Sequence, residues 1–148
     1  MDGFVVACHC DPNLDLLKEI TAKPVVGIGE ASMKMATMLG HEFSVLASAR
    51  HSVPNKEALV RKYHLEGLLA SIRVVERGNY LGAARAAMEK DGAEVIVLGC
   101  AGMTGLDKRL GVKLGIPVLD GVVCALIIAS GLARYGIGTS KARRYNQE

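Results

Sequence analysis

The segment Glu94-Val-Ile-Val-Leu-Gly-Cys100 runs from an acidic residue through apolar residues to a small residue and a cysteine. The segment Asp2-Gly-Phe-Val-Val-Ala-Cys8 repeats this order position by position. Each copy is followed at a similar distance by a second apolar run, which begins 15 residues after the first cysteine as Lys23-Pro-Val-Val-Gly27 and 16 residues after the second as Ile116-Pro-Val-Leu-Asp120. Internal repetition of this kind indicates two copies of one strand–cysteine–helix–strand unit.

Short apolar runs alternate with amphipathic stretches along the whole chain, and this alternation is typical of an α/β fold with parallel sheets covered by helices. We expect strands at 4–8, 24–28, 43–47, 69–75, 95–99 and 118–119, and helices at 12–22, 31–39, 55–63, 80–90, 104–114 and 121–135. Asp11 and Pro12 form a favourable start for the first helix, with Asp11 as the capping residue.

The two copies differ in what precedes them, because two strands and two helices come before Glu94 while only Met1 comes before Asp2. We expect two pseudo-symmetric lobes, with residues 42–120 as the second and residues 1–41 plus 121–148 as a partial first. If the lobes are equivalent, the first lacks its N-terminal strands, a segment of roughly 50 to 65 residues by comparison of the repeats. The strand at 4–8 would then have an unpaired edge.

The composition limits the classes of partner. The 148 residues include 18 basic and 15 acidic side chains and 4% aromatics, which does not favour nucleic acid binding. The longest apolar stretch, 121–133, has 13 residues, whereas a membrane span needs about 20, so we expect a buried helix and no membrane partner. The N-terminus lacks the basic start of a signal peptide, so we expect a cytoplasmic protein with reduced cysteines. The basic tail around Lys141, Arg143 and Arg144 is expected to be solvated.

Cys8 and Cys100 are predicted at the carboxyl ends of parallel strands, where ligands of α/β proteins bind, and just before helix starts, which favour thiolates. Inverting a carbon acid without a cofactor requires removal of a proton from one face and delivery to the other. Two cysteines in facing lobes, one thiolate and one thiol, meet this need. The backbone around Gly99, Ala101 and Gly102 carries no bulky side chain and suits stabilisation of a developing enolate.

Four ordered segments resemble the hydantoin racemase and allantoin racemase branch of the aspartate/glutamate racemase superfamily: ACHCDPNLDLLKE (7–19), PVVGIGEASMKMA (24–36), VIVLGCAGM (95–103) and GIPVLDGVVCA (115–125). The resemblance covers nearly the whole chain. It implies two Rossmann-like lobes with the active site between them and no metal or organic cofactor. It also implies a cysteine from each lobe as acid and base, which here are Cys8 and Cys100.

Amino-acid racemases of the superfamily tend to carry Asn-Thr after the first cysteine and Thr after the second. Here His9-Cys10 and Ala101-Gly102 take those places. This difference implies a ring-amide substrate, a 5-substituted hydantoin or allantoin. We expect His9, Gly29, Glu30, Ala101 and Gly102 to bind this small molecule, and we expect a homo-oligomer. A first-lobe Asn-Pro-Asn turn of the relatives has no counterpart, so the alternative of an inactive, truncated member that acts only through association stays open.

A second alternative comes from the glycine pattern at 27–32 (GIGEAS), which follows a strand and opens a helix. Together with Ser48 and Arg50 it mimics an NADP-binding fingerprint. A zinc site at Cys8, His9 and Cys10 is disfavoured, because three adjacent ligands cannot readily surround one tetrahedral ion and no second cluster of ligands follows. Cys124 lies in the apolar helix and is expected in the core.

Overall fold

The computed structural model describes residues 1–148 and has an α/β architecture with two separate parallel sheets. The strands and helices alternate in the predicted order, and their ends differ from the predicted ones by a few residues. The elements are β1 (Phe4–Val6), α1 (Leu14–Ile20), β2 (Val25–Gly27), α2 (Ile28–Leu39), β3 (Phe43–Ala47), α3 (Val53–Lys62), β4 (Leu69–Val74), α4 (Tyr80–Asp91), β5 (Val95–Leu98), α5 (Asp107–Leu114), β6 (Val118–Asp120) and α6 (Gly121–Tyr135), with short 3-10 turns at Arg50–Ser52, Glu66–Leu68 and Ala101–Met103.

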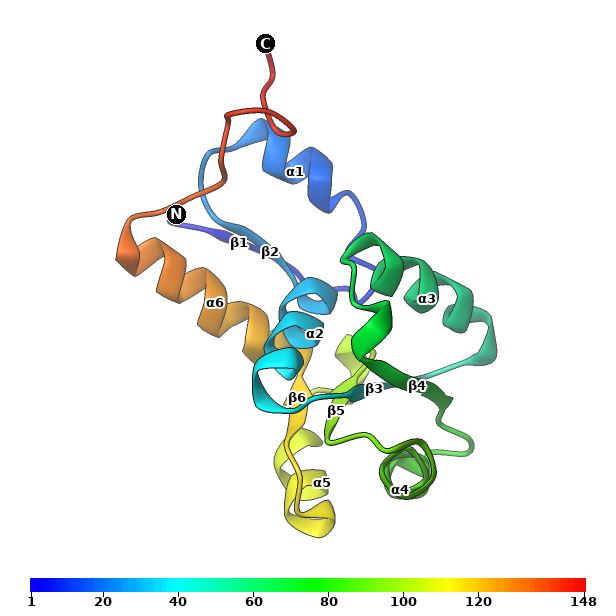
Figure 1. Cartoon of the computed structure of the whole chain (residues 1–148). Helices are drawn as coiled ribbons and strands as arrows, with labels where there is room; N and C mark the ends of the chain where they lie inside the picture. The colour runs from blue at the N-terminus through cyan, green and yellow to red at the C-terminus, as the bar shows by residue number, and fades with distance from the viewer.

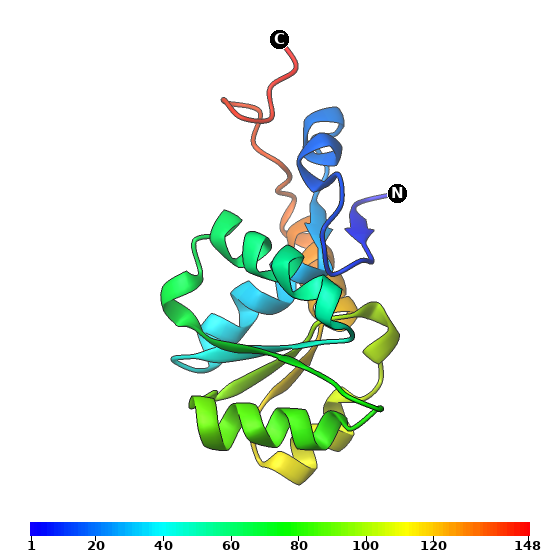
Figure 2. The same ribbon diagram turned by 90° about the vertical axis from the view of Figure 1, so that its right-hand side faces the viewer.

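The larger sheet has the strand order β4-β3-β5-β6, with every pair parallel. Successive side chains of its central strands face opposite sides, so each strand contributes to two cores. Val45 and Val97 pack with Leu59 of α3, while Ile96 and Leu98 pack with α4 and α5. Figure 2 shows this sheet between α2 and α3 on one face and α4 and α5 on the other. Burial on both faces explains the continuous Val/Ile/Leu runs in the sequence.

The smaller sheet pairs β1 with β2, and Figure 1 shows α1 on one side of it and α6 on the other. Helix α2 joins the two parts of the molecule. Its first turn, with Ile28 and Ala31, packs against α6, whereas Met33 and Ala36 pack against the larger sheet. Because α2 packs against both parts, the packing does not mark a boundary between lobes. The division into residues 1–41 plus 121–148 and residues 42–120 stays a prediction.

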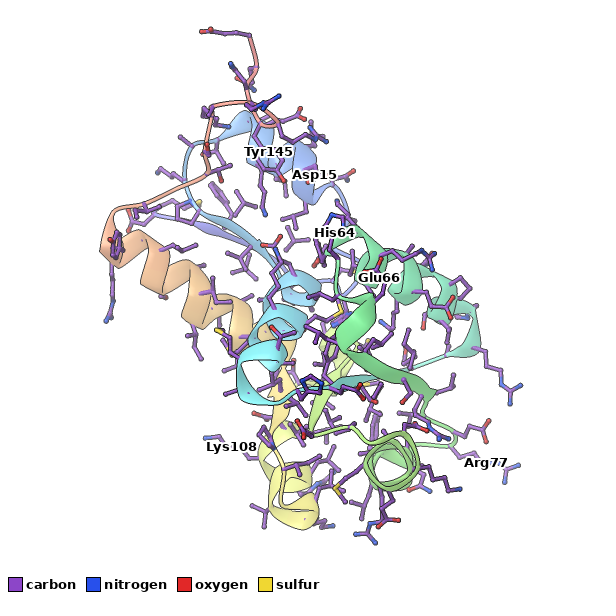
Figure 3. All side chains as sticks on the ribbon, viewed as in Figure 1. Asp15, His64, Glu66, Arg77, Lys108 and Tyr145 are labelled. Carbon is purple, nitrogen blue, oxygen red and sulfur yellow. The ribbon has the colours of Figure 1, made fainter.

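The C-terminal tail after α6 lies along α1, and several of its side chains form hydrogen bonds with that helix. Lys141 Nζ donates to the carbonyl oxygen of Lys18 at 2.6 Å, and the Tyr145 hydroxyl donates to Asp15 at 3.0 Å. Tyr145 and Asp15 lie together at this end of the molecule in Figure 3. Most of the tail is exposed, as expected, although Lys141 and Tyr145 are half-buried against helix α1. No helix combines the length and the apolarity of a membrane-spanning segment.

Candidate functional site

Cys8 and Cys100 occupy equivalent positions in the two sheets. Cys8 lies two residues after the end of β1, and Cys100 lies two residues after the end of β5. Both are free thiols, Cys8 exposed and Cys100 half-buried. Cys100 opens the 3-10 turn Ala101–Met103, and its sulfur accepts a hydrogen bond from the backbone N–H of Gly102 at 3.4 Å. This bond fixes the position of the Cys100 sulfur at the start of the turn.

Lys56 of α3 connects the two cysteine segments, and the sequence prediction missed it. The residue is only 3% exposed, and its Nζ donates to the carbonyl oxygen of Gly99 and lies 3.5 Å from Nδ1 of His9. Gly99 precedes Cys100 and His9 follows Cys8, so one ammonium reaches the neighbours of both thiols. Burial lowers the pKa of Lys56, and the nearby thiols of Cys10, Cys100 and Cys8 oppose that shift. The structure thus links the two cysteine segments through one buried lysine.

His9 is as deeply buried as Lys56, at 3% exposed, and bonds to protein groups on both ring nitrogens. Its Nε2 lies 3.2 Å from the Ser32 hydroxyl, which itself donates to the carbonyl oxygen of Ile28 at 2.7 Å. Because a lysine ammonium can only donate, Nδ1 is the acceptor and Nε2 carries the proton. Burial, and then the charge of Lys56, lower the pKa of His9 to about 3. The imidazole is therefore neutral and orients Lys56.

Cys10 lies beside Cys8 at the surface of the site. The pKa of the Cys10 thiol is raised, first by burial and then by the charge of Cys8. Cys10 is exposed, as Cys8 is.

Asp11 fixes the turn that carries Cys8 against α2. Its carboxylate is buried and accepts hydrogen bonds from the backbone N–H groups of Gly29 at 2.9 Å and Glu30 at 2.7 Å, and from the Tyr63 hydroxyl at 2.6 Å. Burial is the main cause of the raised pKa of Asp11, against the three donors. A side chain on Gly27 would meet this carboxylate at 2.2 Å, so glycine is required there.

The predicted role of Asp11 as the cap of the first helix was wrong. Helix α1 begins at Leu14, and its N-terminus has no side-chain cap. The backbone of Asp11 has a φ of 47° in the left-handed region, which directs its carboxylate across to the start of α2. The aspartate thus caps a helix that begins 17 residues later in the chain, at Ile28.

The first-turn amides of α2 are consequently bonded within the protein. The Glu30 side chain is also engaged, because it pairs with Lys18 at 2.8 Å and lies 3.8 Å from Lys34. The assignment of Gly29 and Glu30 to substrate stays a prediction. A dinucleotide at the 27–32 glycine pattern is not favoured, since its phosphate would compete with the Asp11 carboxylate for the same N–H groups.

Asp120 plays a corresponding part on the Cys100 side, and the sequence prediction had given it no role. Its buried carboxylate caps α6 by accepting from Val122 N–H at 2.9 Å, and it also accepts from Gly105 N–H at 3.0 Å. Gly105 belongs to the loop that follows Cys100, so this aspartate holds the loop to the start of α6. Each cysteine segment is therefore fixed by a buried carboxylate bonded to backbone amides.

Other polar groups lie apart from this cluster. The His, Cys, Asp and Glu side chains form no group of three or more that could hold a metal ion. An open cavity of about 640 Å³ near β4 and α4 is lined by Arg50, Arg73 and Glu76 among others, and by neither Cys8 nor Cys100. Cys124 is 2% exposed in α6, as predicted.

The chain is similar in sequence and in structure to known racemases. Residues 1–129 match the model of the Asp/Glu/Hydantoin racemase family. The chain is 38% identical to a hydantoin racemase of Paenarthrobacter aurescens, over 99% of this chain and 67% of that protein. The allantoin racemase structure from Klebsiella pneumoniae superposes with a TM-score of 0.90 at 33% identity, covering 98% of this chain and 64% of that one. That from Pseudomonas fluorescens gives 0.88 at 35% identity, over 100% and 68%. The chain spans about two thirds of the length of the curated relatives that it matches.

Proposed function

Because the chain belongs to the Asp/Glu/Hydantoin racemase family, we propose that it inverts a carbon acid with Cys8 and Cys100 as acid and base. The observation that carries this proposal is the equivalent position of the two thiols after β1 and β5, with one buried lysine bonded to the residues next to both. In each turnover the thiolate of one cysteine removes a proton from the substrate carbon. The thiol of the other delivers a proton to the opposite face, and their roles exchange with the hand of the substrate.

The chemical class of substrate is proposed from the residues that follow the thiols. Relatives of this chain are named hydantoin racemases and allantoin racemases. A 5-substituted hydantoin or allantoin carries its acidic carbon beside a ring amide, and an enolate develops there when the proton leaves. The backbone at Ala101 and Gly102 carries no large side chain, so the Ala101 N–H can approach that oxygen while the Gly102 N–H bonds to the Cys100 sulfur. His9 supports the site through Lys56 and, being buried, contacts protein groups.

Hydrogen–deuterium exchange at the substrate carbon tests this proposal. The chain is incubated in D₂O with one enantiomer of a 5-alkyl hydantoin, and in parallel with allantoin. Loss of the carbon-bound proton is followed by NMR, inversion is followed by circular dichroism, and a protein-free sample corrects for spontaneous exchange. We expect deuterium in the inverted product. Each of Cys8→Ser and Cys100→Ser should lower inversion by about 100-fold or more, because a serine hydroxyl is far less acidic than a thiol and supplies no anionic base near neutral pH.

Cys124→Ala is the matched control, because Cys124 is a buried thiol of α6 outside the cluster. Its inversion rate should stay within about twofold of the starting protein if it folds normally, as expected for a residue without a part in proton transfer. Absence of exchange with both substrates, or inversion that survives both serine substitutions, would contradict the proposal.

We also propose a homo-oligomer. Val123, Leu126 and Ile127 lie at helical spacing on α6 and are 44%, 53% and 57% exposed. A second copy of the chain would remove this apolar face from water. Light scattering coupled to size-exclusion chromatography tests the assembly, and a mass of one chain at all concentrations would contradict it.

A further inference from the structure

The most unusual group of the molecule is the ammonium of Lys56. Lysine is almost never fully buried unless it is paired with an acid. Lys56 is 3% exposed, yet no carboxylate lies within ion-pair distance of its Nζ. Asp11 is the carboxylate whose charge influences Lys56, but it accepts its hydrogen bonds from two backbone amides and from Tyr63. A buried cation without an anion is costly, so a negative charge placed beside it is stabilised.

The ionisable groups that act on this ammonium are mainly thiols. The charges acting on Lys56 come from Cys10, Cys100 and Cys8, followed by Asp11. Two of its N–H bonds are directed to fixed acceptors, the carbonyl oxygen of Gly99 and Nδ1 of His9. These acceptors are neutral, and each is next in sequence to one of the two cysteines. The charge of Lys56 is therefore fixed against the residues next to Cys8 and Cys100 and is not compensated by its own hydrogen bonds.

The surroundings are arranged to keep Lys56 in that place. Gly99 allows the close approach, because a side chain there would lie 3.0 Å from Cε of Lys56 and 2.2 Å from the carbonyl oxygen of Leu46. His9 is fixed in turn by Ser32 at 3.2 Å and cannot swing away from Nζ without losing that bond. A side chain so restrained presents its charge at one point, which is the requirement for electrostatic preorganisation.

We propose that Lys56 is a positioning residue that holds one of the thiols Cys8 and Cys100 in the thiolate form and balances its charge as it moves. This inference rests on the proposed function. With one thiolate and one thiol, the pair carries a single negative charge, first on one sulfur, then on the substrate enolate and finally on the other sulfur. Lys56 lies within charge range of both sulfurs, so it neutralises that charge at either end of the transfer, whichever enantiomer is bound.

Alkylation of the thiols tests the inference without any substrate. The full chain and Lys56→Met, which keeps the length of the side chain and removes its charge, are reacted with iodoacetamide from pH 5 to pH 10. Modification at Cys8 and Cys100 is then quantified separately by mass spectrometry. Lys56→Met removes the positive charge that would stabilise a thiolate, so it should slow alkylation of at least one of the two by about tenfold at pH 7.

Two further variants control for charge and for folding. Lys56→Arg keeps the charge and should retain a rate closer to that of the starting protein. Arg61→Met removes an exposed positive charge from the same helix and should change the rate by less than about twofold, because exposed charges are screened. If circular dichroism shows that Lys56→Met does not fold, Lys56→Gln takes its place, since it keeps a donor for Gly99 without the charge.

The outcomes separate this inference from the racemase proposal. Alkylation profiles of Lys56→Met and Lys56→Gln that match the starting protein at both cysteines would overturn the role of Lys56, whatever the exchange assay shows. If alkylation slows as expected while the starting protein fails to exchange deuterium into either substrate, the racemase proposal fails, and the lysine–thiolate pair stands as a property of the site.

Discussion

His9 makes the stability of this protein depend on pH in a way that can be calculated. Burial and the charge of Lys56 lower the pKa of His9 from its ordinary 6.5 to about 3. Between these two values the unfolded chain binds a proton at His9 that the folded chain does not. The free energy of unfolding is therefore fully retained above the unfolded pKa and falls as the pH decreases towards 3. Linkage between these pKa values gives a loss of about 2 kcal/mol from pH 7 to pH 5.

The substitution His9→Asn isolates this contribution. The Asn side chain has no proton to gain in this range, and its amide oxygen can replace Nδ1 as the acceptor for Lys56. Ser32 keeps its bond to the carbonyl oxygen of Ile28. Urea unfolding followed by far-UV circular dichroism at pH 5, 6 and 7 gives the free energy of unfolding for both proteins. From pH 7 to pH 5 the starting protein should lose about 2 kcal/mol more than His9→Asn.

His64→Asn is the matched control. His64 is exposed and has a φ of 58°, a conformation that Asn adopts readily. Removing it should leave the pH profile parallel to that of the starting protein. Profiles of the starting protein and His9→Asn that agree within about 0.5 kcal/mol at every pH would refute the reasoning, because His9 would then take up its proton equally in both states.

Two further substitutions test the packing that fixes the site, both by urea unfolding at pH 7. Gly99→Ala should destabilise the protein by about 1 to 3 kcal/mol, because its methyl group would lie 2.2 Å from the carbonyl oxygen of Leu46 in a packed strand end. Asp11→Ala should cost about 2 kcal/mol, since two amides and the Tyr63 hydroxyl lose their acceptor while the cost of burying the carboxylate is removed.

Each of these two variants has its own control. Gly67→Ala meets no atom within 4 Å and should change stability by less than about 0.5 kcal/mol. Tyr63→Phe removes one of the three donors to Asp11 and should cost less than Asp11→Ala, about 1 kcal/mol. Equal effects of Gly99→Ala and Gly67→Ala would contradict the close approach at Gly99. A Tyr63→Phe variant as unstable as Asp11→Ala would show that the capping of α2 contributes nothing.

The sequence by itself determined the order of the elements and the family. Apolar runs such as Val95–Leu98 are buried on both faces, and such burial leaves a continuous pattern that needs no knowledge of neighbours. The repeat that ends in Cys8 and Cys100 is equally local, because each cysteine follows its own strand. Cys124 could be assigned to the core from the apolar helix around it.

Only the tertiary structure decided what surrounds the thiols. Lys56 gave no signal in the sequence, because a single lysine in an amphipathic helix is usually solvated, and its burial depends on contacts with segments 47 and 43 residues away. Asp11 was assigned to the wrong helix because a capping motif in the sequence shows only that a hydrogen-bond acceptor is present. The left-handed backbone at Asp11 directs its carboxylate to the start of α2. Local patterns specify elements through the periodicity of burial; the partners of a buried charge are fixed only when distant segments pack, because electrostatic and hydrogen-bond contacts depend on distance in space.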